Sequence, residues 1–413
     1  MNKNSIIVVG AGIVGCSIAL HLTTNGFPVT LVDRDGPASG ASFGNAGGIV
    51  NNSCVPTSVP GISSNVVRML TQPLSPFSLR PGHLPTALPW LVRFLLESRP
   101  KQADRNATNL HALTKNASRD WISLVGDTEL NRFVNAVGWL KVYESAQAFA
   151  GTAYSRKKMD LLQVPYEVLN QTDIRELEPG LAPIFNHGIF QSDALHISNP
   201  GALVQAMVEL MIKRGGSYKK MSVEKIDLTK EKIEISNSES LFQADKLVIA
   251  AGANSKSLAA KIGDKVSLEA ERGYHMMFPA TTASLLTRPV VNGENSFVLS
   301  PMQTGMRMTS QVEIAGVDAP PDYRRIRSLA PLAKRMLPGL DETEKTVWMG
   351  CRPSLPDSLP VIGSSPSHSR VIYAFGHQHL GMTLGPVTAK LVEGLITNKK
   401  PALDLHPYRV DRF

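Results

Sequence analysis

The fold is decided by residues 5–15, which read Ser5-Ile6-Ile7-Val8-Val9-Gly10-Ala11-Gly12-Ile13-Val14-Gly15. The β-branched run before Gly10 predicts a strand, and the glycine turn leads into a helix that we expect to end near Gly26. A second strand is predicted over residues 28–32 and is followed at once by Asp33. This stretch therefore predicts a βαβ unit with a Gly-x-Gly-x-x-Gly turn, an arrangement that binds dinucleotides.

The position of Asp33 narrows the choice of dinucleotide. Asp33 lies eighteen residues after Gly15, where an acidic side chain accepts hydrogen bonds from an adenosine ribose. A carboxylate there disfavours the 2′-phosphate of NADP, although the neighbouring Arg34 weakens this argument. FAD and NAD both stay open, as does a purely structural role of the glycines in a tight turn. The glycine-rich residues 40–48 then predict an irregular loop around the ligand.

The composition bounds the class of protein. The 413 residues are 43% hydrophobic and 19% charged, which predicts a globular chain of two lobes and excludes disorder and a multi-span membrane protein. The net charge of +8 suits an anionic cofactor, substrate or membrane surface. Nucleic acid is not indicated, because basic runs with interleaved aromatic residues are missing. The three cysteines form no Cys-x-x-Cys pair, so we expect a reducing compartment without a disulfide framework.

A second lobe is predicted from the middle of the chain. Residues 138–143 and 188–191 look like strands of an antiparallel sheet, and residues 265–350 carry further strand-like runs. Recurring prolines after residue 55 are expected to prevent any long helix until residues 90–96. A helix is then predicted over residues 104–126.

Later elements return to the first lobe. Asn199 is the expected N-cap of a helix that ends at residue 214. Residues 246–250 and 371–375 predict buried strands, and residues 386–396 predict a C-terminal helix. The chain is thus expected to cross between the lobes several times.

The chain resembles the FAD-dependent oxidoreductases of the D-amino acid oxidase type, and among them bacterial D-amino acid dehydrogenases. The resemblance rests on the turn at residues 8–15 with Asp33 and on ordered motifs at residues 42–47, 250–255, 350–353 with 360–363, and 376–381. It implies FAD as the cofactor, lying extended across the first domain with its flavin ring facing a cavity roofed by the second domain's sheet. The expected fold class is an α/β Rossmann-like FAD-binding domain with a second, α+β substrate domain built on an antiparallel sheet. The expected bounds are 1–55, 199–263 and 351–413 for the first domain, and 56–198 and 264–350 for the second.

Two residues are candidates for the chemistry. In the family, the Arg of a Gly-x-Arg-Pro segment pairs with the substrate carboxylate, which assigns Arg352 to that task, and its planar fork suits bidentate pairing. The alternative for Arg352 is a structural ion pair at the domain seam. Tyr274 stands where similar enzymes carry an active-site tyrosine or polar residue, and simple packing is its alternative role.

The resemblance also assigns cofactor-binding residues. The C-terminal loop at residues 376–381 is expected to contact the flavin through backbone N–H groups, and the helix expected from Pro386 adds its N-terminal dipole. His377 and His379 do not indicate a metal, because no convincing third ligand accompanies them. The full expected set is Gly10, Gly12, Ile13, Val14, Gly15, Asp33, Arg34, Ser42, Asn45, Ala46, Gly47, Val223, Ala251, Gly252, Gly376, His379, Leu380, Gly381, Met382 and Thr383.

The expected reaction is oxidation of the Cα–N bond of a D-amino acid, with hydride transfer to the flavin N5 and electrons passed to a quinone or another respiratory acceptor. Residues 272–275 and 380–386 look similar to enzymes that act on cyclic D-imino acids such as hydroxy-D-proline. One alternative is an enzyme like sarcosine or glycine oxidase that uses oxygen. Another is a flavin-carrying subunit of a hetero-oligomer.

Membrane contact is a further expectation. Residues 90–96, with Arg93 and the positive net charge, suggest an amphipathic patch on the inner face of the cytoplasmic membrane. The alternative is a helix packed on the protein's own core. We otherwise expect a cytoplasmic protein, because the apolar N-terminal stretch fits the first strand and helix better than a signal peptide.

Overall fold

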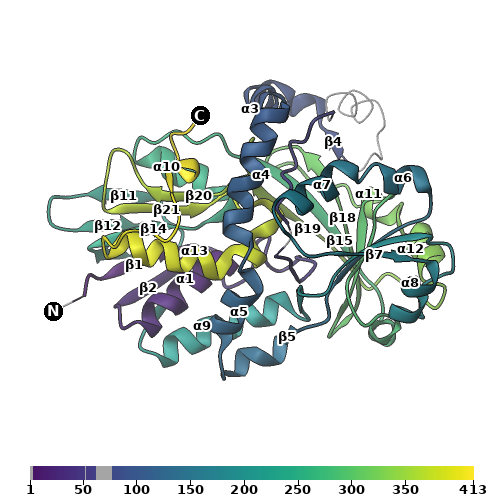
Figure 1. The fold of residues 1–413 in the computed structure, drawn as a ribbon. Helices are drawn as coiled ribbons and strands as arrows, with labels where there is room; N and C mark the ends of the chain where they lie inside the picture. The colour runs from purple at the N-terminus through teal and green to yellow at the C-terminus, as the bar shows by residue number, and fades with distance from the viewer. Residues whose placement is uncertain (1–2, 52, 62–76) are drawn as a thin grey trace.

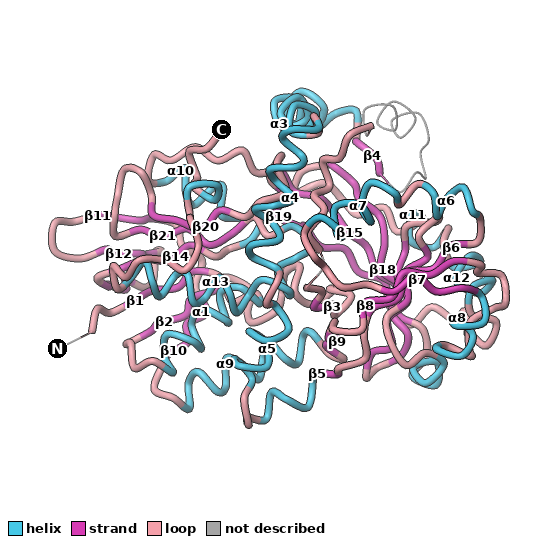
Figure 2. Tube along the Cα trace, viewed as in Figure 1, coloured by secondary structure: helices cyan, strands magenta, loops and turns pink. Residues whose placement is uncertain are grey.

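The computed structural model describes residues 3–51, 53–61 and 77–413. Two large sheets lie side by side, one at each end of the molecule, and helices run between and around them (Figure 1; Figure 2). Pro73 and Pro76, which belong to the segment that we expected to be irregular, lie outside the described residues.

The first sheet has six strands and contains the βαβ unit. β1 pairs in parallel with β2 on one side and with β14 on the other, and the antiparallel β20 closes one edge. All four side chains of β1 are buried, as expected for a central parallel strand. The spatial order is β10 (Ser217–Lys220), β2 (Val29–Asp33), β1 (Ile6–Val9), β14 (Lys246–Ile249), β21 (Val371–Phe375) and β20 (Val361–Ser364).

Helices cover one face of this sheet, and a small three-stranded sheet covers the other. The helices α1 (Ile13–Thr24), α9 (Pro200–Lys213) and α13 (Gly381–Ile396) bury their apolar sides against β1 and β2. Asn199 caps α9 as expected, because its side chain accepts from the Ala202 N–H. The small sheet consists of β11 (Lys225–Leu228), β12 (Ile233–Ser236) and β13 (Leu241–Ala244).

The second sheet is mostly antiparallel and belongs to the second lobe. Its outer face packs on α8 (Gln171–Leu177), α11 (Arg324–Arg327) and α12 (Ala330–Met336) (Figure 1). Its inner face turns toward the first lobe. Its main path runs through β19 (Thr346–Ser354), β15 (Glu269–Met277), β18 (Gly305–Ile314), β17 (Phe297–Met302), β16 (Val290–Asn292), β6 (Trp139–Tyr143), β8 (His187–Gln191) and β7 (Glu167–Asn170), and β4 (Phe77–Leu79) pairs with β18.

Shorter elements complete the described chain. A sheet of three very short strands connects the lobes. It consists of β3 (Gly48–Ile49), β9 (Leu195–Ile197) and β5 (Val134–Asn135). The remaining helices are α3 (Leu84–Glu97), α4 (Pro100–Thr114), α5 (Ala117–Val125), α6 (Ala146–Ala150), α7 (Ala153–Leu161) and α10 (Ser255–Lys261).

Three expected helix boundaries were wrong. α3 begins at Leu84 rather than near residue 90, because Pro85 occupies the first turn, where its missing N–H costs nothing. Residues 104–126 form two helices, α4 and α5. The C-terminal helix α13 begins at Gly381, so Pro386 lies inside it rather than at its start.

The proposed domain division also changes in two places. Residue 351 falls inside β19, which pairs with β15 as far as Ser354, so we place that boundary after Ser354. α4 and α5, expected in the second domain, pack on the first. The indole N–H of Trp121 donates to the Met382 carbonyl of α13 at 2.7 Å, and Leu110 joins the core beside Leu384.

Candidate active site

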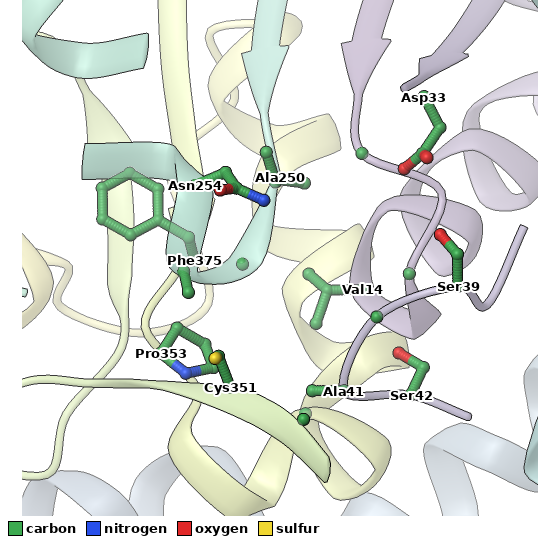
Figure 3. Close-up of a pocket in the computed structure, with 18 of the residues that line it drawn as sticks. Val14, Asp33, Ser39, Ala41, Ser42, Ala250, Asn254, Cys351, Pro353 and Phe375 are labelled. Carbon is green, nitrogen blue, oxygen red and sulfur yellow. The ribbon is translucent and has the colours of Figure 1, made fainter. Parts of the chain in front are cut away.

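A cavity of about 530 Å³ opens at the carboxyl ends of β1, β2 and β14. Ligands of open α/β sheets bind at this edge. In Figure 3, Asp33 and Ser42 stand on one wall, and Asn254, Phe375 and Cys351 stand on the other. The cavity therefore lies between the predicted dinucleotide turn and the end of β19.

The glycine turn lines one side of the cavity and requires residues without a Cβ. Gly10 has φ of +114°, and a Cβ there would lie 2.4 Å from the Ala250 carbonyl oxygen. At Gly15 a Cβ would lie 1.8 Å from the Gly10 carbonyl oxygen, so this glycine allows α1 to approach β1 closely. The turn thus leaves backbone exposed at the helix N-terminus, which is where a pyrophosphate binds.

Asp33 is fixed at the rim of the cavity by backbone hydrogen bonds. One carboxylate oxygen accepts from the Ala11 N–H at 2.7 Å, and the other accepts from the N–H groups of Asp35 and Gly36 at 2.8 and 2.9 Å. Carboxylate oxygens have further lone pairs for ribose hydroxyls. Arg34 pairs with Asp35, so it does not neutralise Asp33 directly.

The loop at residues 40–48 is held from both lobes. Ser42 Oγ accepts from the N–H of Ile13, the first residue of α1, at 2.9 Å. From β18, Arg307 donates to the carbonyl oxygens of Phe43 and Asn45 at 3.0 and 2.8 Å. Burial lowers the pKa of Arg307 to about 10, so it stays charged at neutral pH. Sequence reasoning missed Arg307, and its only signal was an arginine within an apolar strand.

Most of the predicted cofactor residues line the cavity, together with Ser39, Ser222 and Lys261, which sequence reasoning missed. Those that do are Gly10, Gly12, Ile13, Val14, Asp33, Arg34, Ser42, Asn45, Val223, Ala251, Gly252, Gly376, Gly381 and Met382. Those that do not are Gly15, Ala46, Gly47, His379, Leu380 and Thr383.

Gly47 and Thr383 do not line the cavity but contact the segments around it. The N–H of Gly47 donates to Asn45 Oδ1 at 2.7 Å, and a Cβ at Gly47 would lie 2.4 Å from the Ile197 carbonyl oxygen of β9. The Thr383 hydroxyl donates to the Gly48 carbonyl at 3.4 Å, which ties α13 to the glycine-rich loop.

Arg352 lies on the inner face of the second sheet, opposite Glu271 in the β15–β19 pairing. Its guanidinium fits over Gly273, where a Cβ would lie 2.2 Å from Nη2. Nη1 donates to the Gln311 carbonyl oxygen at 3.0 Å. Gln311 has φ of +73° beside an irregularity in the β15–β18 pairing. Burial lowers the pKa of Arg352, while the nearby Glu271 opposes this shift.

Tyr274 is not at the cavity. The side chains of a strand alternate between the two faces of the sheet, and Tyr274 points into the outer core with Met276. Its hydroxyl donates to Glu313 at 2.5 Å, and burial and this bond raise the pKa of Tyr274 to about 12. The expected catalytic role is therefore wrong, and packing is its role.

Neutral histidines lie near the cavity. His275 follows Tyr274 on the inner face and stacks on Trp348, and burial lowers the pKa of His275 to about 3. His379 precedes α13 and is exposed, and desolvation together with the cations Arg352 and Lys141 lowers its pKa. His377 lines the cavity, and its Nε2 lies 3.0 Å from the Thr388 hydroxyl oxygen.

Comparisons with known proteins agree with this geometry. A family model described as FAD dependent oxidoreductase (DAO) matches residues 5–395. The chain is 31% identical to a D-amino-acid oxidase of Bradyrhizobium diazoefficiens over 99% of this chain and 98% of that protein. The chain belongs to the DAO family of FAD-dependent oxidoreductases.

Solved structures of this DAO-family fold extend over the whole chain. A glycine oxidase from Geobacillus kaustophilus superposes with a TM-score of 0.75 at 21% identity, covering all of both chains. An L-proline dehydrogenase from P. horikoshii gives a TM-score of 0.75 at 17% identity, covering 100% of this chain and 98% of that one. The expected fold class, FAD as cofactor and oxidoreductase class are confirmed. The glycine turn and the hydrogen-bonded Asp33 carboxylate fit FAD.

Proposed function

We propose that this flavoenzyme oxidises the Cα–N bond of a D-amino acid, or of a cyclic D-imino acid, to the imine. The observation that carries this proposal is Arg352, whose guanidinium lies over Gly273 on the sheet face that turns toward the first lobe. The similarity to a D-amino-acid oxidase over nearly the whole chain supports the same substrate class.

The chain's own residues bind and orient the substrate. The Arg352 fork pairs with the α-carboxylate by two charge-assisted hydrogen bonds and thereby directs the Cα–H. The carbonyl of Gln311 fixes one edge of that fork. His379 is neutral at pH 7, so it does not repel a substrate amine.

The cofactor would be held by the first lobe. The N-terminus of α1 would receive the pyrophosphate, Asp33 the ribose, and the loop at residues 376–381 the flavin edge. When bound, FAD supplies the hydride acceptor at its N5 atom. The substrate reacts as the free amine, so its ammonium proton must leave before or during binding.

The electron acceptor in this proposal is a quinone or another respiratory carrier, reached at an anionic membrane surface. None of the helices in the described residues has the length and apolarity needed to cross a membrane. In this proposal the contact with the membrane is peripheral, through the exposed aliphatic side chains of α3. Parallel assays of quinone reduction and oxygen consumption separate this acceptor from the oxygen used by the alternative, a sarcosine- or glycine-oxidase-like enzyme.

Anaerobic flavin reduction tests the substrate class. Purified protein is expected to be yellow and to lose its visible flavin absorbance when D-amino acids or cyclic D-imino acids are added, as is typical of flavin reduction. Matched L-amino acids serve as the control and should react much more slowly. If neither the D-amino acids nor the cyclic D-imino acids bleach the flavin, the proposed function is wrong.

A further inference from the structure

The pairing of β15 with β18 contains a β-bulge where the Arg352 guanidinium lies. The register shifts around Gly273, so that two residues of β18, Gln311 and Val312, oppose this one residue of β15. The Arg352 guanidinium fits over the same Gly273, and its Nη1 donates to the Gln311 carbonyl oxygen at 3.0 Å. The bulge therefore supplies a backbone acceptor that holds one edge of the fork.

Gln311 needs support from its side chain, because its backbone is strained. Its φ of +73° lies in the left-handed region, which residues other than glycine rarely adopt and which persists only where the surroundings hold it. Gln311 Oε1 accepts from Arg325 Nη2 at 2.7 Å. Nε2 of the same amide is buried and has no hydrogen-bond partner within residues 3–51, 53–61 and 77–413. The bond from Arg325 is therefore what holds this amide.

Arg325 is itself fixed on the outer face of the second sheet. It belongs to α11 and is 2% exposed, and the next residue, Ile326, lies in the outer core. The N–H of Asp322, just before α11, donates to the Tyr274 hydroxyl at 3.2 Å, which ties the start of the helix to β15. A guanidinium held in this way donates a charge-assisted hydrogen bond from a defined position.

Gln311 thus joins two arginines on opposite faces of the sheet, with its side-chain oxygen on Arg325 and its backbone oxygen on Arg352. On the basis of the proposed function, in which Arg352 binds the substrate α-carboxylate, we propose that Arg325 is a positioning residue. It holds the Gln311 bulge, and the bulge orients the Arg352 fork. Neither Arg325 nor Gln311 lines the dinucleotide cavity, so flavin binding does not depend on them.

The first test removes the N–H donors of Arg325. Anaerobic flavin reduction is measured with a D-amino acid and with its decarboxylated amine, which does not use the fork. Arg325→Met should lose at least about tenfold in kcat/KM on the acid and less than about threefold on the amine, with normal flavin content. Arg327→Met is the matched control, because Arg327 belongs to the same helix but pairs with Glu344 at the surface. It should change neither rate.

The second test uses the strained backbone of Gln311. Glycine adopts positive φ without steric cost, so Gln311→Gly should keep the bulge without the bond from Arg325. Adding Arg325→Met to Gln311→Gly should then cost less than about threefold on the acid, whereas Gln311→Leu alone should lose at least about tenfold. The contrast between the two Gln311 variants tests the proposal even if Arg325→Met does not fold. A full loss from Arg325→Met in the glycine background, or an equal loss on acid and amine, would overturn the role of Arg325.

Binding of propionate separates this proposal from the proposed function. Propionate has a carboxylate but no amine to oxidise, and its binding is followed by the change in visible flavin absorbance. Its Kd should rise at least about tenfold in Arg325→Met and stay unchanged in Arg327→Met. If propionate follows this pattern but no D-amino or D-imino acid reduces the flavin, the proposed function is wrong while the role of Arg325 stands. Equal propionate affinity in wild type and Arg325→Met, or no binding by the wild type, would overturn that role.

Discussion

Asp33 has two tasks at the cavity rim, because it shapes the turn after β2 and faces the expected ribose. Its oxygens accept from three backbone N–H groups, so its removal frees these donors as well as the ligand contact. We predict that Asp33→Ala weakens FAD binding at least about tenfold, measured by flavin retention and titration of the apoprotein. Asp33→Asn keeps one acceptor oxygen and should retain more flavin. Unchanged affinity in Asp33→Ala would contradict the assignment.

Gly273 makes room for the Arg352 guanidinium. A Cβ at this position would lie 2.2 Å from Nη2, so Gly273→Ala must displace the fork. We expect kcat/KM for D-amino acids to fall at least about a hundredfold, because misplacement by about 1 Å costs that much orientation. Flavin content should stay normal, since Gly273 does not line the dinucleotide cavity.

Gly363→Ala is the matched control, because its nearest neighbour would be 4.0 Å from the new Cβ. It should leave turnover unchanged. Full activity of Gly273→Ala would show that the position of the guanidinium does not matter for catalysis.

At the scale of elements, α3 has two different faces. Trp90 and Phe94 stack and pack on the core, and the Trp90 indole donates to the Ser354 carbonyl at 3.1 Å. The predicted patch at residues 90–96 was therefore wrong for Trp90 and Phe94. The exposed face carries aliphatic side chains along the helix, with Leu88 51% and Val92 50% exposed. The whole set is Leu84, Leu88, Val92, Leu95 and Leu96.

Charge around α3 favours an anionic surface. Within residues 80–103, Glu97 is the one acidic residue, and it is buried near Arg93 and Arg105. Arg99 and Lys101 are exposed at the end of the helix. In Figure 1, α3 stands at the edge of the molecule, where a flat surface could reach it.

We predict that the protein co-sediments with anionic vesicles at low salt, because the exposed aliphatic face and the basic end of α3 add apolar and electrostatic attraction. Leu88→Gln with Val92→Gln should lower the bound fraction at least about fivefold. Ile122→Gln removes an equally exposed aliphatic side chain on α5 and should not. Wild-type protein that stays in the supernatant would exclude this contact.

The strands show what sequence patterns could predict. β1, β2 and β21 were predictable because short apolar runs bounded by glycine or acidic residues are local signals. β15 was different, since all nine of its residues are buried and both of its faces carry polar or charged residues. Sequence reasoning could therefore not tell that Tyr274 faces the outer core while Gly273 and His275 face the first lobe.

At the scale of the whole molecule, function depends on how the two lobes meet. Arg307 links β18 to the glycine-rich loop, and Trp139 and Trp348 close on Gly48 and Gly44 across the seam. The first lobe holds the dinucleotide and the second presents Arg352. The family motifs predicted the dinucleotide turn and Arg352. The contacts of Arg307 and the two tryptophans could be identified only from the structure, because they join residues of different lobes.

Recognition of the substrate carboxylate by Arg352 can be tested by the kinetics of flavin reduction. Rates of anaerobic flavin reduction are compared for wild type, Arg352→Lys and Arg352→Ala, using a D-amino acid and its decarboxylated amine. The wild type is expected to prefer the acid strongly. Loss of the fork should cost about 2–5 kcal/mol on the acid alone, with flavin content unchanged and little rescue by lysine. If Arg352→Ala oxidises the D-amino acid as fast as wild type, Arg352 is structural and does not recognise the substrate carboxylate.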